Sequence, residues 1–354
     1  MYRLLLGALF ASCAMAQCRL PDVAPDALDR LSPAGLVDAG HFLRAEKQLD
    51  SLVKANPQDG QAAWLLSRAK AALGEMDEAL SLAESAVGAD PDNAAYHVQV
   101  AAVAGRIAEK ANLLKQLTFA KKARQELDAA TKIDSGNIEA QYGLMLFYFA
   151  APALVGGDKN KAARIGEQIA ATSPARGRFY QARLAVQMKD YAKAESYLRQ
   201  SAIEDPLLFD TDAALAKLYI DLKPDRTKAE IWACQAVHAD PTRADAWALM
   251  ARVYTMCGCW TEALDMARRA GVVDGENQSA AYAIADVAVE RGEQLALAVD
   301  LLRKYLNQPA EGDQPTPAMA HARLGAALAK LGKTDEANAE FAAAKLDPKA
   351  PAAN

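Results

Sequence analysis

A spacing that recurs along this chain limits what it can fold into more than any other feature. An alanine is followed twelve residues later by a proline at Ala45/Pro57, Ala79/Pro91, Ala162/Pro174, Ala194/Pro206 and Ala229/Pro241. Pro57 and Pro91 are 34 residues apart, and so are Pro241 and Gly275. A period of this length is typical of repeat proteins, in which each unit is one supersecondary motif that stacks on its neighbours.

The residue types at the repeated positions indicate helices. Alanine and leucine are abundant and only 6% of the residues are aromatic, which favours closely packed helices. Small residues such as Ala251 and Ala263 suit the points where two helices cross. Each repeated proline ends the second helix of a unit, because proline cannot continue a helix. Glycines such as Gly74, Gly258 and Gly332 suit the left-handed conformation of a turn between helices.

Two longer motifs point to a known family. They are AWALMARVYTMCGCWTEALDMARRA, starting at Ala246, and HARLGAALAKLGKTDEANAEF, starting at His321. The family positions that they carry are Trp247, Met250, Ala251, Tyr254, Gly258, Ala263 and Ala270, then Leu324, Gly325, Gly332, Ala337 and Phe341. The chain therefore resembles the tetratricopeptide repeat (TPR) proteins. The resemblance implies an all-α, right-handed α-solenoid of about nine helix hairpins.

The resemblance extends roughly from residue 26 to residue 348, with a linker at 17–25 before it and a tail at 349–354 after it. The units are expected to end near residues 57, 91, 135, 174, 206, 241, 275, 309 and 348. Three units depart from the period. The 94–137 unit is about ten residues too long, the 138–176 unit is about five too long, and Pro33 shortens the first helix of the first unit.

The first sixteen residues have the pattern of an export signal. Arg3 precedes the apolar run LLLGALFA, and Ala14–Ala16 forms an A-x-A cleavage site before Gln17. An alternative is lipid attachment at Cys13, for which Phe10 is a poor fit, so simple cleavage after Ala16 is favoured. We expect a periplasmic or secreted protein, and no later segment of the sequence has transmembrane length.

Cleavage after Ala16 leaves an even number of cysteines, Cys18, Cys234, Cys257 and Cys259. An oxidising compartment favours disulfides. Cys234 lies early in a second helix, antiparallel to the helix that ends at Cys257, so a bridge from Cys234 to Cys257 or Cys259 is one expectation and free thiols are the other. No metal is expected, because no histidine follows closely enough to complete a zinc site.

The sequence offers no catalytic or cofactor-binding pattern. Gly156 and Gly157 lack the Lys-Ser or Lys-Thr pair of a phosphate-binding loop, so Asp158 is expected to cap a helix after a long turn. The four histidines, His41, His97, His238 and His321, lie in different units. The net charge is −5 without a basic cluster, which argues against nucleic acid. We expect neither an enzyme nor a cofactor.

The resemblance also predicts where a partner binds. In TPR proteins the first helices of the units line a concave groove. By register, the residues that would line it here are Tyr142, Leu146, Phe149, Phe179, Arg183, Lys217, Arg252 and Met256. An apolar cluster flanked by cations suits an amphipathic or acidic peptide. The alternative is that Tyr142 and Phe149 only pack beneath the long turn.

The expected function is that of an exported scaffold or adaptor that binds an envelope protein or peptide segment through its groove. The long 94–137 unit and the APALVGGDKNKA turn resemble a pattern in exported bacterial TPR proteins of unassigned role. The alternative is an accessory protein that presents a small molecule to a periplasmic transport system. An open groove favours the first, and a closed apolar pocket near Tyr142 and Phe149 favours the second.

Overall fold

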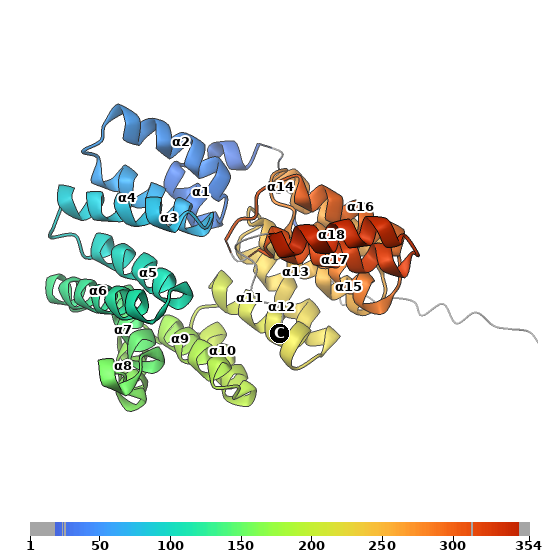
Figure 1. Cartoon of the computed structure of the whole chain (residues 1–354). Helices are drawn as coiled ribbons and strands as arrows, with labels where there is room; N and C mark the ends of the chain where they lie inside the picture. Colours follow the sequence, from blue (N-terminus) through green and yellow to red (C-terminus); the bar gives the residue numbers. More distant parts are fainter. Residues whose placement is uncertain (1–17, 23, 25, 313, 347–354) are drawn as a thin grey trace, which may run out of the picture.

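The computed structural model describes residues 18–22, 24, 26–312 and 314–346, so the expected signal sequence and Cys13 lie outside the described part. This part contains eighteen α-helices and no strand (Figure 1). The helices are α1 (Pro33–Ala39), α2 (Phe42–Ala55), α3 (Gly60–Ala72), α4 (Met76–Ala89), α5 (Ala94–Lys110), α6 (Leu113–Ile133), α7 (Ile138–Ala150), α8 (Lys159–Thr172), α9 (Pro174–Gln187), α10 (Tyr191–Glu204), α11 (Phe209–Lys217), α12 (Arg226–Ala239), α13 (Ala244–Met256), α14 (Trp260–Val273), α15 (Ser279–Arg291), α16 (Leu295–Leu306), α17 (Pro317–Lys330) and α18 (Thr334–Leu346). Consecutive helices pair as hairpins from α1/α2 to α17/α18, which confirms the all-α solenoid.

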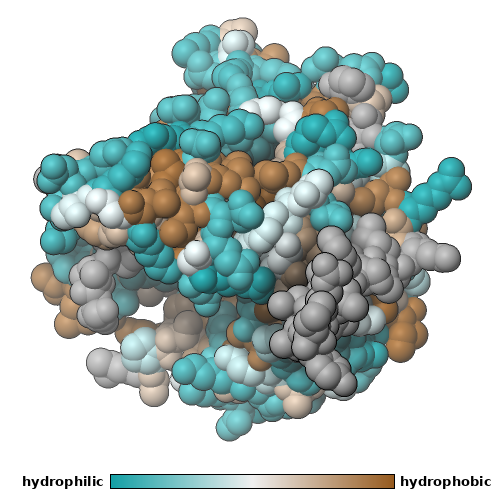
Figure 2. Space-filling model, turned by 90° about the vertical axis from the view of Figure 1, so that its right-hand side faces the viewer, coloured by the Kyte–Doolittle hydropathy of each residue, from teal (hydrophilic) through white to brown (hydrophobic). Residues whose placement is uncertain are grey.

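The recurring residues act as the pattern predicts. The alanines at the repeated position are fully buried where the two helices of a unit meet, and they are Ala45, Ala79, Ala162, Ala194, Ala229 and Ala263. After each turn an Asp or Asn commonly caps the next helix: Asp59 accepts from the Ala62 N–H and Asn93 from the Ala95 N–H. Seen from the side of the C-terminal helices, the surface is mostly hydrophilic, with hydrophobic side chains gathered in a band (Figure 2).

The two long units use their extra residues differently. In the 94–137 unit the surplus lengthens both helices, since α5 has 17 residues and α6 has 21. In the 138–176 unit it forms the connection between α7 and α8, which includes a short 3₁₀ turn at Ala153–Val155. Gly156 there has φ +97°, and Asp158 accepts from the Lys161 N–H as the cap of α8. The stretch is therefore a turn after a helix, which confirms the sequence interpretation.

The array curves back until its first unit contacts its last ones. Figure 1 shows the blue N-terminal helices beside the yellow and orange helices of the C-terminal half. The Leu43 N–H donates to Glu311 Oε1 at 2.9 Å, and the Gly312 N–H donates to the Ala72 carbonyl at 2.9 Å. His41 Nδ1 lies 2.6 Å from Asp274 Oδ2. These contacts, together with the Lys47–Glu276 ion pair, form what we call the closure.

The disulfides correct the predicted pairing of Cys234 with Cys257 or Cys259. Cys234, in α12, is bonded to Cys18, and Cys257 is bonded to Cys259. The prediction considered only helices that are neighbours in sequence. Cys18 belongs to the segment before α1, and the curvature of the array brings this residue to α12. Cys257 and Cys259 flank Gly258, whose φ of +70° turns the chain and leaves their Cα atoms 5.3 Å apart. The first bridge therefore adds a covalent link to the closure.

Candidate binding site on the concave face

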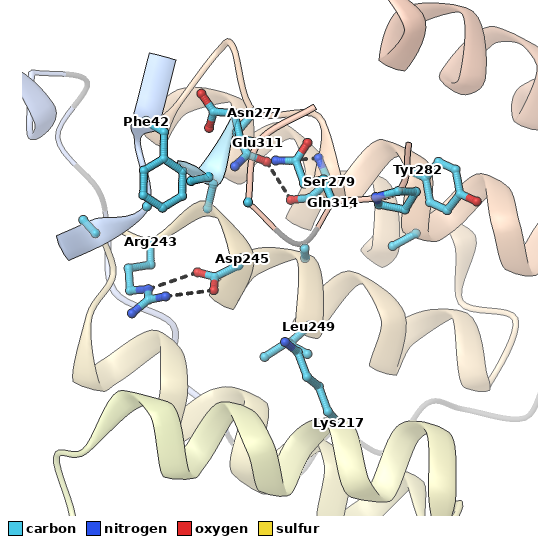
Figure 3. A pocket seen from close by; sticks show the side chains of 18 of the residues that line it. Phe42, Lys217, Arg243, Asp245, Leu249, Asn277, Ser279, Tyr282, Glu311 and Gln314 are labelled. Atoms are coloured by element: carbon cyan, nitrogen blue, oxygen red, sulfur yellow. Dashed lines mark hydrogen bonds and ion pairs between the residues drawn. The ribbon is translucent and has the colours of Figure 1, made fainter. Parts of the chain in front are cut away.

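The first helices of the last four units share a cavity of about 650 Å³, which the first unit closes from the other side. Lys217 of α11, Arg252 of α13, Tyr282 of α15 and Arg323 of α17 lie along one wall. The opposite wall has Val37–Gly40, Phe42, Ala72 and Arg106 from α1 to α5, and Glu311, Gly312, Gln314 and Pro315 come from the segment between α16 and α17. Figure 3 shows Lys217 at one end of this space and Glu311 with Asn277 at the other. The cavity therefore exists only because the array closes.

Most cations around the cavity are neutralised by a neighbouring carboxylate. Arg243 pairs with Asp245 at 3.2 Å, and Arg252 makes a bidentate pair with Asp221. Arg323 lies 2.5 Å from Asp286. Within the described part of the chain, Lys217 and Arg106 line the cavity without a carboxylate partner. Lys217 gives its end of the cavity a positive potential, and Arg106 adds a second positive charge to the lining.

Glu311 places a carboxyl group at the end of the cavity away from Lys217. Its side chain is only 3% exposed, and Oε1 accepts the Leu43 N–H. Oε2 is buried and has no hydrogen-bond partner among the described residues. Burial raises the pKa of Glu311 to about 7; the Leu43 N–H opposes this rise, and the nearby Asp274 adds to it.

A buried contact between His41 and Asp274 lies near Glu311. His41 and Asp274 are each about 1% exposed. His41 Nε2 is 2.8 Å from the Thr242 carbonyl, so both ring nitrogens face acceptor oxygens, and a protonated imidazolium donates to both. Burial raises the pKa of Asp274, but the hydrogen bond and charge of His41 outweigh it, and the pKa lies below its ordinary value. His41 therefore stabilises the ionised form of Asp274.

The residues predicted to line one groove fall into two separate places. Lys217 and Arg252 line the cavity. Tyr142, Phe179 and Arg183 meet at α7 and α9 instead, where Tyr142 stacks on Tyr180 at 3.8 Å between ring centroids. The Arg183 guanidinium lies 5.7 Å from the centre of the Tyr142 ring and 5.9 Å from that of Phe179.

The remaining predicted groove residues, Leu146, Phe149 and Met256, are half-buried and do not line the cavity. Phe149 carries the Lys159 ammonium 5.4 Å from its ring centre. No binding measurement bears on any of these residues, so their role stays a prediction. The sequence interpretation missed Glu311, Phe42 and Tyr282. Glu311 belongs to a connection between helices, and no helical register predicts which residues such a connection brings to a cavity.

One further cluster has metal-ligating side chains. Donor atoms of Cys18, Cys234 and His238 lie within 4.8 Å of one another. Both sulfur atoms belong to the Cys18–Cys234 disulfide, which leaves one exposed imidazole as a ligand. The cluster as it stands is therefore a disulfide beside a histidine.

Comparison with known proteins agrees with the repeat pattern. Residues 35–94, from α1 to the start of α5, match the tetratricopeptide repeat family model. The same hairpin pattern continues to α18, so the rest of the described chain is similar to TPR proteins in its repeating unit. No curated protein matches the chain in sequence. Repeats of this kind form extended concave surfaces that bind other proteins, which supports a role as a protein–protein interaction scaffold.

Comparison with solved structures gives partial matches at low sequence identity. A thermophilic TPR protein in Thermus thermophilus is 20% identical over 51% of this chain and 94% of its own, with a TM-score of 0.45. The APC/C hetero-tetramer Cut9–Hcn1 is 17% identical over 84% of this chain, with a TM-score of 0.47, and the match spans 54% of that longer chain. MamA is 22% identical over 46% of this chain and 92% of its own, with a TM-score of 0.36.

No helix of the described residues combines the length and the apolar composition needed to cross a membrane.

Proposed function

We propose that this protein is an exported, non-enzymatic scaffold that holds a peptide segment of a cell-envelope protein in the cavity on its concave face. The observation that carries the proposal is the position of the cavity. It lies on α11, α13, α15 and α17, the first helices of four consecutive units, which is the surface that TPR arrays present to partners.

The charges of the cavity support a polar, partly acidic segment as the occupant. Lys217 and Arg106 have no carboxylate partner among the residues that the structure describes, and complementary charge gives a binding site its specificity. Ala248 and Leu249 form an apolar part of the cavity wall. An exported location is supported by the apolar N-terminal segment and by two disulfides, which persist in oxidising compartments.

A small molecule presented to a transport system is the second candidate. The closure favours it, because the first unit encloses the concave face, and about 650 Å³ is a volume typical of small-molecule sites. The charged wall differs from the apolar pocket near Tyr142 and Phe149 that this function was expected to need. We therefore rank it below peptide binding.

Ala248→Trp tests the proposal, because a large side chain on α13 would fill the cavity. The purified protein and this variant would each be used to capture proteins from detergent-treated envelopes, with cross-linked peptides mapped by mass spectrometry. Ala342→Trp, on the exposed surface of α18, is the matched control, and circular dichroism checks folding. We expect a partner segment cross-linked to the cavity wall in the wild type and control and lost from Ala248→Trp.

Equal capture by all three proteins would place the interface outside the cavity. The double variant Tyr142→Arg, Phe149→Arg would then test the aromatic cluster of α7 and α9. Loss of capture in that variant alone would contradict the cavity as the binding site.

A further inference from the structure

Glu311, which lines the cavity, has an unpartnered carboxylate oxygen. The carboxylate is almost completely buried, and the closure uses only Oε1, through the Leu43 N–H. Oε2 is buried at the edge of the cavity and has no hydrogen-bond partner among the residues that the structure describes. A buried carboxylate oxygen without a donor is costly, so a site that retains one is suited to a ligand that supplies the donor.

The neighbouring cations do not supply that donor. Arg243 is paired with Asp245 and Arg323 with Asp286, and the two ring nitrogens of His41 contact Asp274 and the Thr242 carbonyl. The groups around Glu311 are mainly acidic, with Asp274 and Glu276 adding to its negative potential. The end of the cavity therefore favours a positively charged donor.

The walls beside Glu311 fit a small cationic group. A Cβ on Gly312 would lie 3.3 Å from the Phe42 ring, so this ring covers the residue after Glu311. Asn277 and Ser279 lie at the same end (Figure 3), and the Ser279 hydroxyl donates to Asn277 Oδ1, which leaves its own oxygen as an acceptor. An ammonium group has three donors and suits several acceptors beside an aromatic ring.

We infer that Glu311 binds a primary ammonium group of the ligand, while Lys217 at the far end, with Arg106 of the opposite wall as a second cation, binds its anionic part. The ligand class is an amphoteric peptide segment with a free α-amino group. This inference rests on the proposed function, since it names the chemistry that the same cavity recognises. A free diamine carries the same ammonium chemistry, and the experiment separates the two sources.

Binding of an ammonium group requires Glu311 as a carboxylate. The groups that face it are the Leu43 N–H from α2, His41 before α2, and Asp274 and Glu276 after α14, and together with burial they leave its pKa near 7. Protonation below that pH removes the charge that attracts the ligand. Affinity is therefore expected to fall about tenfold or more from pH 8 to pH 5.5.

The experiment titrates the purified protein, with both disulfides intact, against three probes at pH 8. These are a pool of random lysine-free hexapeptides with free amino termini, the same pool N-acetylated, and 1,4-diaminobutane. Binding is measured by calorimetry and by ligand-observed NMR. Glu311→Gln retains an oxygen for the Leu43 N–H but loses the negative charge, and Glu293→Gln, exposed and outside the cavity, is the control.

We expect the free-amine peptides to bind the wild type and Glu293→Gln, and to bind Glu311→Gln and the acetylated pool about tenfold or more weakly. Equal binding of the two pools, unchanged binding by Glu311→Gln, or no binding of any probe would overturn the inference. Acetylated peptides that bind and are excluded by Ala248→Trp would leave the proposed function standing without the ammonium contact. Binding of 1,4-diaminobutane alone would keep the ammonium contact and contradict the peptide function.

Discussion

At the scale of single residues, one hydrogen bond explains the aromatic position of the first helices. Trp247 is fully buried, and its indole N–H donates to the carbonyl of Pro241, six residues earlier, at 3.0 Å. His97 has the same relation to Pro91, with Nε2 at 2.9 Å from the carbonyl. A carbonyl at the end of a helix needs a donor, and both side chains supply a ring N–H. Gln141 at the same position of α7 donates its side-chain amide to the Ser135 carbonyl, also six residues earlier, so the position suits any side chain that carries an N–H.

Replacement of Trp247 by Phe tests this donor. The ring volume is largely kept, but the Pro241 carbonyl loses its partner, and we expect the variant to lose about 1–3 kcal/mol of stability from the unmade hydrogen bond and the reduced packing. Chemical denaturation would measure the loss. Trp64, half-buried on α3, provides the comparison through Trp64→Phe, because none of the hydrogen bonds found among the described residues involves its N–H. Equal losses in the two variants would refute the role of the hydrogen bond.

Glu311 should make the stability of the protein depend on pH. Its pKa of about 7 in the folded state exceeds the ordinary value of 4.5, so the folded protein binds more protons than the unfolded chain between these values. Stability contributed by the protonated form is therefore lost as pH rises from about 4 to about 7. Glu311→Gln should remove this loss and gain up to about 3 kcal/mol relative to wild type at pH 8, with little gain at pH 4. Melting curves at both pH values would show it, and a gain that does not change with pH would contradict the assignment.

At the scale of helices, the distance between neighbours is set by what stands at their crossing. A Cβ on Gly177, in the first turn of α9, would lie 2.3 Å from the backbone of Ala170 in α8. Only glycine permits this approach of two backbones. Gly88 in α4 has open space around it, with no atom within 4 Å of a Cβ placed there. Gly177 is therefore needed for the close packing of α8 and α9, whereas a side chain at Gly88 would meet no neighbouring atom.

Alanine at each glycine should separate these roles. Gly177→Ala forces α8 and α9 apart, and we expect a loss of about 1–3 kcal/mol or more. Gly88→Ala favours the helix without a clash and should be neutral or stabilising by up to about 1 kcal/mol. Denaturation followed by circular dichroism would compare the midpoints. A Gly177→Ala variant as stable as wild type would show that the two helices shift freely.

At the scale of the whole molecule, the closure decides whether a cavity exists. It combines the buried His41–Asp274 pair, backbone hydrogen bonds to Glu311 and Ala72, and the Cys18–Cys234 bridge. The exposed Lys47–Glu276 pair crosses the same boundary. Removal of one member of a buried pair leaves the other charge unpaired, whereas an exposed pair contributes little. The buried pair therefore dominates the electrostatics of the closure.

His41→Leu combined with Cys18→Ser should open the array. We expect faster hydrogen exchange in α1 to α4 and a larger radius of gyration by small-angle X-ray scattering, because Asp274 stays buried without its partner. Lys47→Ala combined with Cys18→Ser is the control, since it removes only the exposed pair, and it should keep the compact dimensions. Opening to the same extent in both variants would mean that the disulfide alone maintains the closure.

The repeating unit can be predicted from residue spacing alone. The alanine at each crossing, the proline after each second helix and the capping residues such as Asp59 and Asp158 act within one hairpin, so their spacing predicts the helices and the solenoid. The same helical register predicted that Lys217 and Arg252 lie on the inner face of first helices, and both residues line the cavity.

Only the tertiary structure decided the closure, the Cys18–Cys234 bridge and the cavity end at Glu311. Each unit turns the array by a small rotation, and the long 94–137 and 138–176 units alter that rotation by amounts that no residue spacing encodes. Contacts across 233 and 268 residues, at His41–Asp274 and Leu43–Glu311, depend on the sum of all these rotations. A local pattern therefore specifies each hairpin, while the site between the ends arises from the accumulated curvature of the whole array.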